Sequence, residues 1–168
     1  AAGARPAPEF DAPTASISLN TGEAWTGNRT LTVHATATDT STVASTCISD
    51  NATTCARWRT YEADASFDLN TLQGQHTVRA WFKDVHGNIT PTAATATIGL
   101  DTTAPVDGTV SVTGGDETIE LALSNFRDSG SGVASYVVAS GTTRVPTTCA
   151  RGTPVATADG AETSITLT

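Results

Sequence analysis

Methionine is absent from this chain of 168 residues, and its single lysine is Lys83. Charged residues make up only 15% of the chain and aromatic residues 5%, and the formal net charge is -8 at pH 7. Nucleic-acid binding requires a basic stripe, and docking on anionic lipid requires a basic cluster. The composition therefore argues against nucleic acids and membrane surfaces as partners.

Long apolar runs are also absent, and none approaches the length of a membrane-spanning helix. Residues 1–12 are rich in Ala and Pro and lack the apolar region of a signal peptide, so we expect a linker or a mature N-terminus there. No metalloprotease or nucleophile-elbow motif occurs, and His34, His76 and His86 are expected at the surface. We expect no catalytic residues, although a catalytic domain can exist elsewhere in the parent protein.

Cysteine occurs three times, at Cys47, Cys55 and Cys149. The first two enclose a short polar segment, and a disulfide between them would contribute about 2.5 kcal/mol in the chain-entropy model. A zinc site is the weaker interpretation, because no second Cys or His pair stands at ligand spacing. A disulfide predicts an oxidising, extracellular compartment.

Threonine is abundant, at about one residue in five, which favours strands with a polar outer face. Residues 30–39 alternate strictly between apolar and polar side chains, the period of a half-buried strand. Similar alternation recurs between turn signals across residues 13–100. Short strands at this spacing predict an all-β fold and an antiparallel β-sandwich.

Residues 101–105, Asp-Thr-Thr-Ala-Pro, interrupt this pattern, which restarts after them. Because proline fixes φ and extends its predecessor, we expect a semi-rigid interdomain hinge. The organisation predicted is a sandwich over 13–100, the hinge over 101–105, and a second domain over 106–168. About five strands are expected in the second domain, against the seven of a sandwich, so we expect it to be partial.

The first module resembles bacterial immunoglobulin-like domains of large secreted and surface proteins. The resemblance rests on the runs at 25–33, 58–61 and 67–69, on His76–Asp84 with Gly87-Asn88, and on the seam at 100–105. It covers nearly all of residues 13–105. It implies an immunoglobulin-like β-sandwich.

The second module resembles a bacterial fibronectin type III domain through residues 126–136. It departs from that pattern because a leucine in Glu120–Leu123 replaces the usual tryptophan, and because the final two strands are missing. The resemblance implies that Cys149 would pair with a cysteine in those strands. Cys149 is therefore expected to be unpaired here.

Aspartates are expected to gather at the ends of the sandwiches, where the B–C and F–G loops cluster near the incoming linker. Such carboxylates suit Ca²⁺, a hard cation that binds six to eight oxygens. The alternative is that they cap strands and turns. The candidate ligands are Asp11, Asp39 and Asp84 for the first module, and Asp101 and Asp128 for the second.

Trp81 is placed by parity on the outer face of its strand, opposite to Ala80 and Phe82. An outward tryptophan could stack on a sugar or meet a neighbouring domain, and packing beneath Trp58 or a loop is the favoured alternative.

The leading hypothesis is a non-catalytic stalk, spacer or adhesion region of a bacterial extracellular or cell-surface protein. Its partners would be the neighbouring domains of the parent protein, with a cell-surface glycan or protein as a further candidate. One alternative is an accessory, substrate-binding region of a secreted peptidase or glycosidase. Another is a fibre subunit whose open second module accepts a strand from its neighbour.

Overall fold

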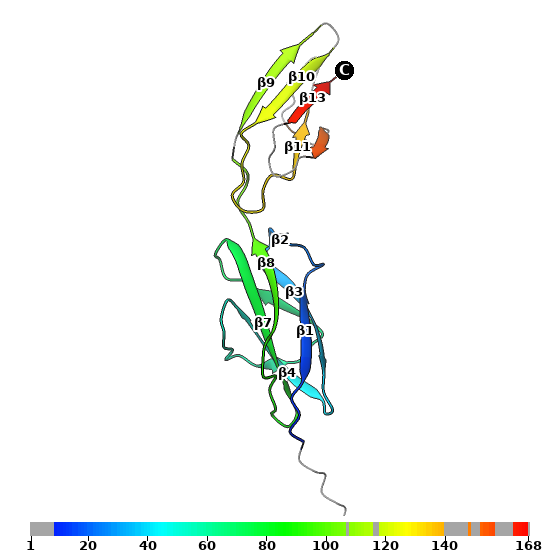
Figure 1. The fold of residues 1–168 in the computed structure, drawn as a ribbon, viewed down its shortest axis with the longest axis vertical. Coiled ribbons are helices and arrows are strands. Elements are labelled where there is room, and N and C mark those ends of the chain that lie inside the picture. Colours follow the sequence, from blue (N-terminus) through cyan, green and yellow to red (C-terminus); the bar gives the residue numbers. More distant parts are fainter. Residues whose placement is uncertain are drawn as a thin grey trace, which may run out of the picture. The chain divides into compact units, whose positions relative to one another are not determined.

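The computed structural model describes residues 9–106, 108–115, 118–139, 148, 152–156 and 163–167. Every regular element in these residues is a β-strand, and the fold is all-β as predicted (Figure 1). The chain divides into two compact units, Ala1–Thr102 and Thr103–Thr168.

The first unit contains two sheets whose strands are antiparallel, except for one short parallel pair. The three-stranded sheet has the order β1-β3-β6, and the five-stranded sheet has the order β2-β8-β7-β4-β5. The strands are β1 (Thr14–Leu19), β2 (Trp25–Thr26), β3 (Thr30–Thr38), β4 (Val43–Asp50), β5 (Arg59–Thr60), β6 (Asp64–Asp68), β7 (Gly74–Asp84) and β8 (Ala94–Leu100).

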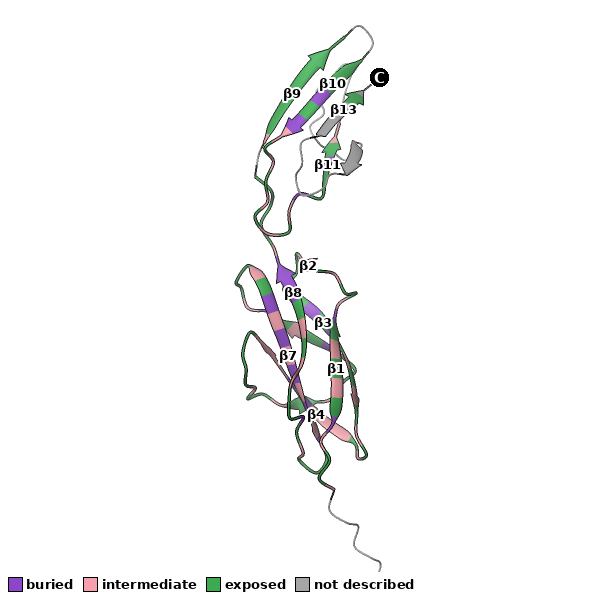
Figure 2. Cartoon of the chain, viewed as in Figure 1, coloured by how far each residue is buried: buried purple, intermediate pink, exposed green. Residues whose placement is uncertain are grey.

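The core lies between these sheets, because its cluster of buried side chains draws on strands of both. Its buried members are Leu19, Leu31, Val33, Leu69, Val78, Ile98 and Leu100. Along β7 the even-numbered residues from His76 to Asp84 are buried and the odd-numbered ones are half-buried or exposed, as the purple bands in Figure 2 show. This two-residue period is that of a strand with one face toward a core. The unit is sandwich-like.

Strands β1, β3, β6, β7 and β8 lie where the alternation predicts them, whereas no alternation predicts β4. Residues 43–50 carry buried or half-buried side chains on both faces, and the register shifts between Val43 and Ser45. Such a strand lacks a polar face, so its sequence does not alternate. The two-residue strands β2 and β5 are too short to produce any pattern of their own.

Trp25 lies directly on the backbone of β8. A Cβ atom built on Gly99 would approach the Trp25 ring to 2.2 Å, which no real side chain could do. Trp25 and Gly99 are also register partners in the parallel pair of β2 with β8. Glycine at position 99 therefore lets the indole cover this end of the core.

The second unit has five strands in its described residues, the number expected from sequence. One sheet has the order β13-β10-β9, and β11 pairs with β12. Their bounds are β9 (Thr109–Gly114), β10 (Ile119–Ser124), β11 (Ser135–Val138), β12 (Thr153–Ala156) and β13 (Thr163–Leu167).

The core of the second unit is small in the residues that the structure describes. Leu123, Val133 and Tyr136 are buried, and Phe126 packs edge-on to Tyr136 with the ring centroids 5.1 Å apart. On β9, Val110 and Val112 are 51% and 64% exposed, although their register partners on β10 are buried. The apolar face of this sheet is thus only partly covered.

A disulfide joins Cys47 to Cys55, with the two α-carbons 6.0 Å apart, which confirms the predicted bridge. The expectation for Cys149 lies outside the described residues. The described part of the chain contains no helix with the length and apolarity that a membrane crossing requires.

Candidate cation site at the entry end of the first unit

Asp84 ends β7 and is 2% exposed, on the inward-facing side of the strand. Its Oδ1 accepts hydrogen bonds from the backbone N–H groups of His86 (2.9 Å) and Asn88 (2.8 Å). Its Oδ2 accepts from Asn88 Nδ2 (2.8 Å) and lies 3.2 Å from Ser41 Oγ. The turn after β7 therefore forms around this carboxylate.

Asp39 follows β3 and approaches Asp84 through Ser41. Its Oδ1 accepts hydrogen bonds from the backbone N–H and from the hydroxyl of Ser41, both at 2.8 Å. Its Oδ2 is buried, and no donor in the described residues reaches it. A buried carboxylate oxygen without a partner is costly, so a bound cation or an ordered water would relieve it.

Glu9 supplies the third carboxylate, from the segment that leads into β1. Asn88 Nδ2 lies 3.3 Å from both the carbonyl oxygen and Oε2 of Glu9. The backbone N–H of Asp11 donates to Glu9 Oε1 at 2.5 Å. The entering chain is thereby attached to the loop after β7.

One carboxylate oxygen from each of Glu9, Asp39 and Asp84 lies within 4.8 Å of the other two. Two oxygens bound to one Ca²⁺ at about 2.3–2.6 Å each can be separated by up to about 5 Å, so the spacing fits this ion. Waters or backbone carbonyls would have to complete six to eight ligands. Exposed acidic groups also cluster without an ion, and the Asn88 bonds alone give this cluster a turn-forming role.

Two opposed effects act on the pKa of Asp84. Burial raises the pKa of this carboxyl, but hydrogen bonds with the side chain and backbone of Asn88, the Glu9 side chain and the Gly87 backbone together outweigh burial and hold the pKa well below its ordinary range. Asp84 is therefore ionised beside two further acids. Adjacent negative charges repel, and a divalent cation would offset that repulsion.

The predicted ligands are only partly brought together. Asp39 and Asp84 meet, but the third member of the group is Glu9, whereas Asp11 is exposed. Asp101 belongs to the first unit and Asp128 to the second, where Asp128 Oδ1 accepts the N–H of Gly130 at 2.8 Å. Bonds of that kind cap turns.

Glu9 is not among the predicted ligands, because the sequence predicts a linker over residues 1–12. One sequence feature could have indicated Glu9: it stands two residues before the predicted ligand Asp11. Alternate residues of an extended chain lie on the same side, so the two acids can face the same site. What places Glu9 is Asn88, which sequence alone could not pair with it.

Trp81 lies half-buried on the outer face of β7, the face that its parity predicts, with Cys47 as its register partner on β4. Two residues along β7, the ammonium of Lys83 stands 4.5 Å from the centroid of the Trp58 ring. The aromatic side chains on this face are therefore partly covered by the chain itself.

The histidines divide into two kinds. His34 and His86 are exposed as expected, but the expectation for His76 is wrong, because it is 1% exposed. His76 has the same parity as Val78 and Ala80, so it faces the core.

No family model matches the chain, and no curated protein is significantly similar to it.

Proposed function

We propose that this chain provides non-catalytic spacer modules, the first immunoglobulin-like and the second fibronectin type III-like, in a bacterial extracellular or cell-surface protein. The strand-only architecture, the disulfide and the sequence resemblance support this proposal. Neighbouring domains of the parent protein are its first partners.

The observation that carries the proposal is where the chain enters and leaves the first unit. Glu9 contacts Asn88 and the carboxylate of Asp84 lies nearby, at the end of β7. Leu100, at the exit, pairs with Gly74 at the start of β7. Eleven residues of strand separate these points, a distance of about 35 Å. Entry and exit at opposite ends are what a spacer needs, because each unit then adds its own length.

We further propose that calcium binds Glu9, Asp39 and Asp84. The ion would hold the entering segment against the two loops at this end, and so would stiffen the junction with whatever precedes the sandwich. The triad supports this assignment through its spacing and through the partnerless Asp39 oxygen.

Single-molecule force spectroscopy tests the spacer function on the full chain held at both ends. The chain enters through β1 at one end and leaves through β8 at the other, so pulling would load the β1–β3 and β7–β8 pairs along the strands. Shear of this kind resists force better than sequential unzipping of bonds. We expect one abrupt unfolding step for the first unit. Gradual extension without such a step would contradict the proposal.

A further inference from the structure

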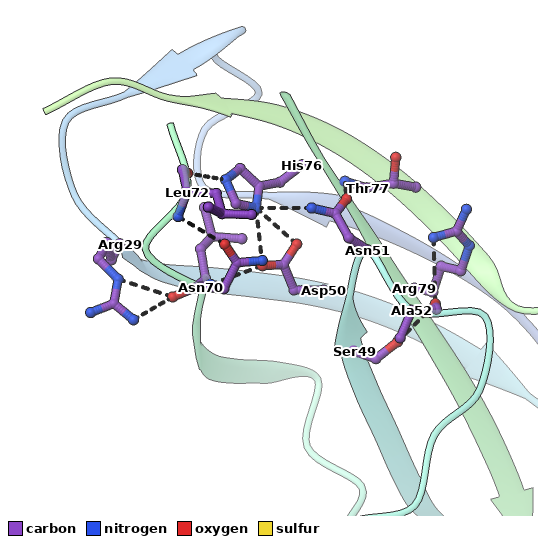
Figure 3. A network of polar contacts seen from close by, with 11 residues as sticks. Arg29, Ser49, Asp50, Asn51, Ala52, Asn70, Leu72, His76, Thr77 and Arg79 are labelled. Carbon is purple, nitrogen blue, oxygen red and sulfur yellow. Dashed lines mark hydrogen bonds and ion pairs between the residues drawn. The ribbon is translucent and has the colours of Figure 1, made fainter. Parts of the chain in front are cut away.

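A buried histidine–aspartate pair, drawn in Figure 3, lies near the start of β7, at the exit end of the first unit. The side chains of His76 on β7 and Asp50 on β4 are 1% and 7% exposed. Their strands are neighbours in the five-stranded sheet, and both side chains face inward. The pair plays no part in the proposed spacer function or in calcium binding.

Both ring nitrogens of His76 face oxygen acceptors. Nδ1 lies 2.8 Å and 3.0 Å from the two carboxylate oxygens of Asp50, and Nε2 lies 2.8 Å from the carbonyl oxygen of Leu72. A carbonyl oxygen can only accept, so Nε2 carries a proton. An ionised carboxylate can only accept as well, so Nδ1 carries the second proton.

Among the described residues, Asn51 is the one other polar partner near His76 Nδ1, because its Nδ2 lies 3.5 Å from that nitrogen. As a donor it would favour an unprotonated Nδ1, whereas Asp50 favours a protonated one. Its amide is oriented by the backbone N–H of Thr77, which donates to Asn51 Oδ1 at 2.8 Å. At 3.5 Å the amide is a much weaker partner for Nδ1 than the carboxylate. The contacts therefore favour an imidazolium.

The same pair holds the loop between β6 and β7. Asp50 Oδ2 accepts the backbone N–H of Asn70 at 2.8 Å, while the His76 ring holds the Leu72 carbonyl. The next residue, Gln73, then exchanges two hydrogen bonds with Thr102, at 3.0 Å and 2.8 Å. Thr102 is the last residue of the first unit, so the loop connects the buried pair to the exit strand.

We propose that His76 is a proton-dependent latch: as an imidazolium paired with Asp50 it fixes the 69–73 loop onto the exit segment, and loss of one ring proton to solvent releases that loop. A neutral ring leaves either the Leu72 carbonyl without a donor or a nitrogen lone pair facing a carboxylate. Either defect is costly in a buried site.

A further charged group at this loop is Arg29, which precedes β3 and donates to the Leu69 carbonyl through Nε (3.0 Å) and Nη2 (2.6 Å). It holds the start of the loop at any pH at which the protein folds. The apolar core residues behind the ring carry no charge. The latch therefore closes at lower pH and opens as the pH rises.

Ring-nitrogen NMR of the folded chain, combined with amide hydrogen exchange, tests this directly. In the closed state the His76 ring shows the two-proton pattern of an imidazolium. As the pH rises, loss of that pattern coincides with a loss of protection at the Asn70 and Thr102 amides of about tenfold to a hundredfold. A neutral ring in the protected state, or protection that does not change when the ring loses its proton, would overturn the proposal.

A double-mutant cycle supplies a second readout that does not depend on spectral assignment. We expect His76→Gln and Asp50→Asn to be strongly coupled at low pH and weakly coupled at high pH. The exposed pair His34–Asp64, at 2.6 Å, is the matched control and should show little coupling at either pH. Coupling of His76 with Asp50 that stays constant with pH would indicate a neutral structural hydrogen bond instead.

Discussion

Three acids from three separate segments meet at the entry end of the first unit: Glu9 before β1, Asp39 after β3 and Asp84 at the end of β7. The burial of Asp84 and the partnerless oxygen of Asp39 separate this group from ordinary surface aspartates. At the residue scale, the question is which acid joins Asp39 and Asp84 in the proposed calcium site. The sequence points to Asp11, and the structure points to Glu9.

Calorimetric titration with Ca²⁺ can separate these two acids. We expect Glu9→Gln and Asp39→Asn each to weaken calcium binding by about tenfold or more, because each removes a charged oxygen ligand. Asp11→Asn removes the same charge two residues away and should leave the affinity nearly unchanged. Absence of both heat and thermal shift in the unmodified chain would refute calcium binding, and equal losses at Glu9 and Asp11 would refute the assignment.

Glu23 makes a separate prediction at this scale. The side chain of Asn20 donates to it at 2.6 Å, its own backbone N–H and the Thr21 hydroxyl also donate, and together they lower its pKa from 4.5 to about 2. A lowered folded-state pKa means that the contribution to stability is present above pH 4.5 and is lost as the pH falls toward 2.

The measurement is the pH dependence of unfolding for the unmodified chain and for Glu23→Gln. The unmodified chain should be the more stable at neutral pH, and the difference should close as the solution is acidified through this window. An NMR titration of the Glu23 carboxyl with a midpoint near its ordinary value would contradict the hydrogen-bonding account.

At the scale of elements, the disulfide ties β4 to the segment before β5. Between Cys47 and Cys55, the side-chain hydrogen bonds of the described residues include those from Ser49 Oγ (3.2 Å) and Arg79 Nη1 (3.4 Å) to the Ala52 carbonyl. These bonds are exposed, and most of residues 51–57 are exposed as well. Asn51 also exchanges two hydrogen bonds with the backbone of Thr77, at 2.9 Å and 2.8 Å, so the covalent link is the main constraint only on the part of the loop after Asn51.

Reducing the disulfide should lower the free energy of unfolding by about 2.5 kcal/mol. Chemical denaturation of the oxidised and reduced chains measures this, and the paired variant Cys47→Ala with Cys55→Ala controls for the free thiols. Protease cleavage should increase within residues 51–58, while the β4–β7 pairing persists. Equal stabilities would show that the loop is held by its packing and not by the bridge.

The success of predicting strands from the sequence also differs from element to element. The strands β3 and β7 could be predicted because each has one polar and one apolar face. Strand β4 could not, because its outer side carries the buried disulfide cysteine Cys47, beside the half-buried Trp81 of β7, so the alternation is lost. The position of Glu9 depends on a contact with Asn88, 79 residues away, which no local pattern encodes.

His76 is the opposite case, since its burial could have been predicted. It continues the inward series of Val78, Ala80 and Phe82, although a polar residue near a strand start is ordinarily expected at the surface. The hydrogen bonds at both ring nitrogens explain why a polar side chain is tolerated there, because buried polar groups are retained where they are hydrogen-bonded.

At the scale of the whole molecule, the central claim is that the chain adds length and resists extension. The first unit supports it through its opposite entry and exit ends, with β1 paired to β3 and β8 paired to β7 along the direction of pull. The triad at the entry end would take up load first, because Glu9 precedes β1 in the chain.

Force spectroscopy of the full chain, with calcium and with a chelator, tests this claim most directly. We expect one abrupt step for the first unit, recognised because reducing the disulfide, whose cysteines are eight residues apart, lengthens that step by about 3 nm. Calcium should raise the force of this step, and Asp39→Asn should abolish the increase. Smooth extension at low force, with no step that responds to the disulfide, would contradict the spacer function.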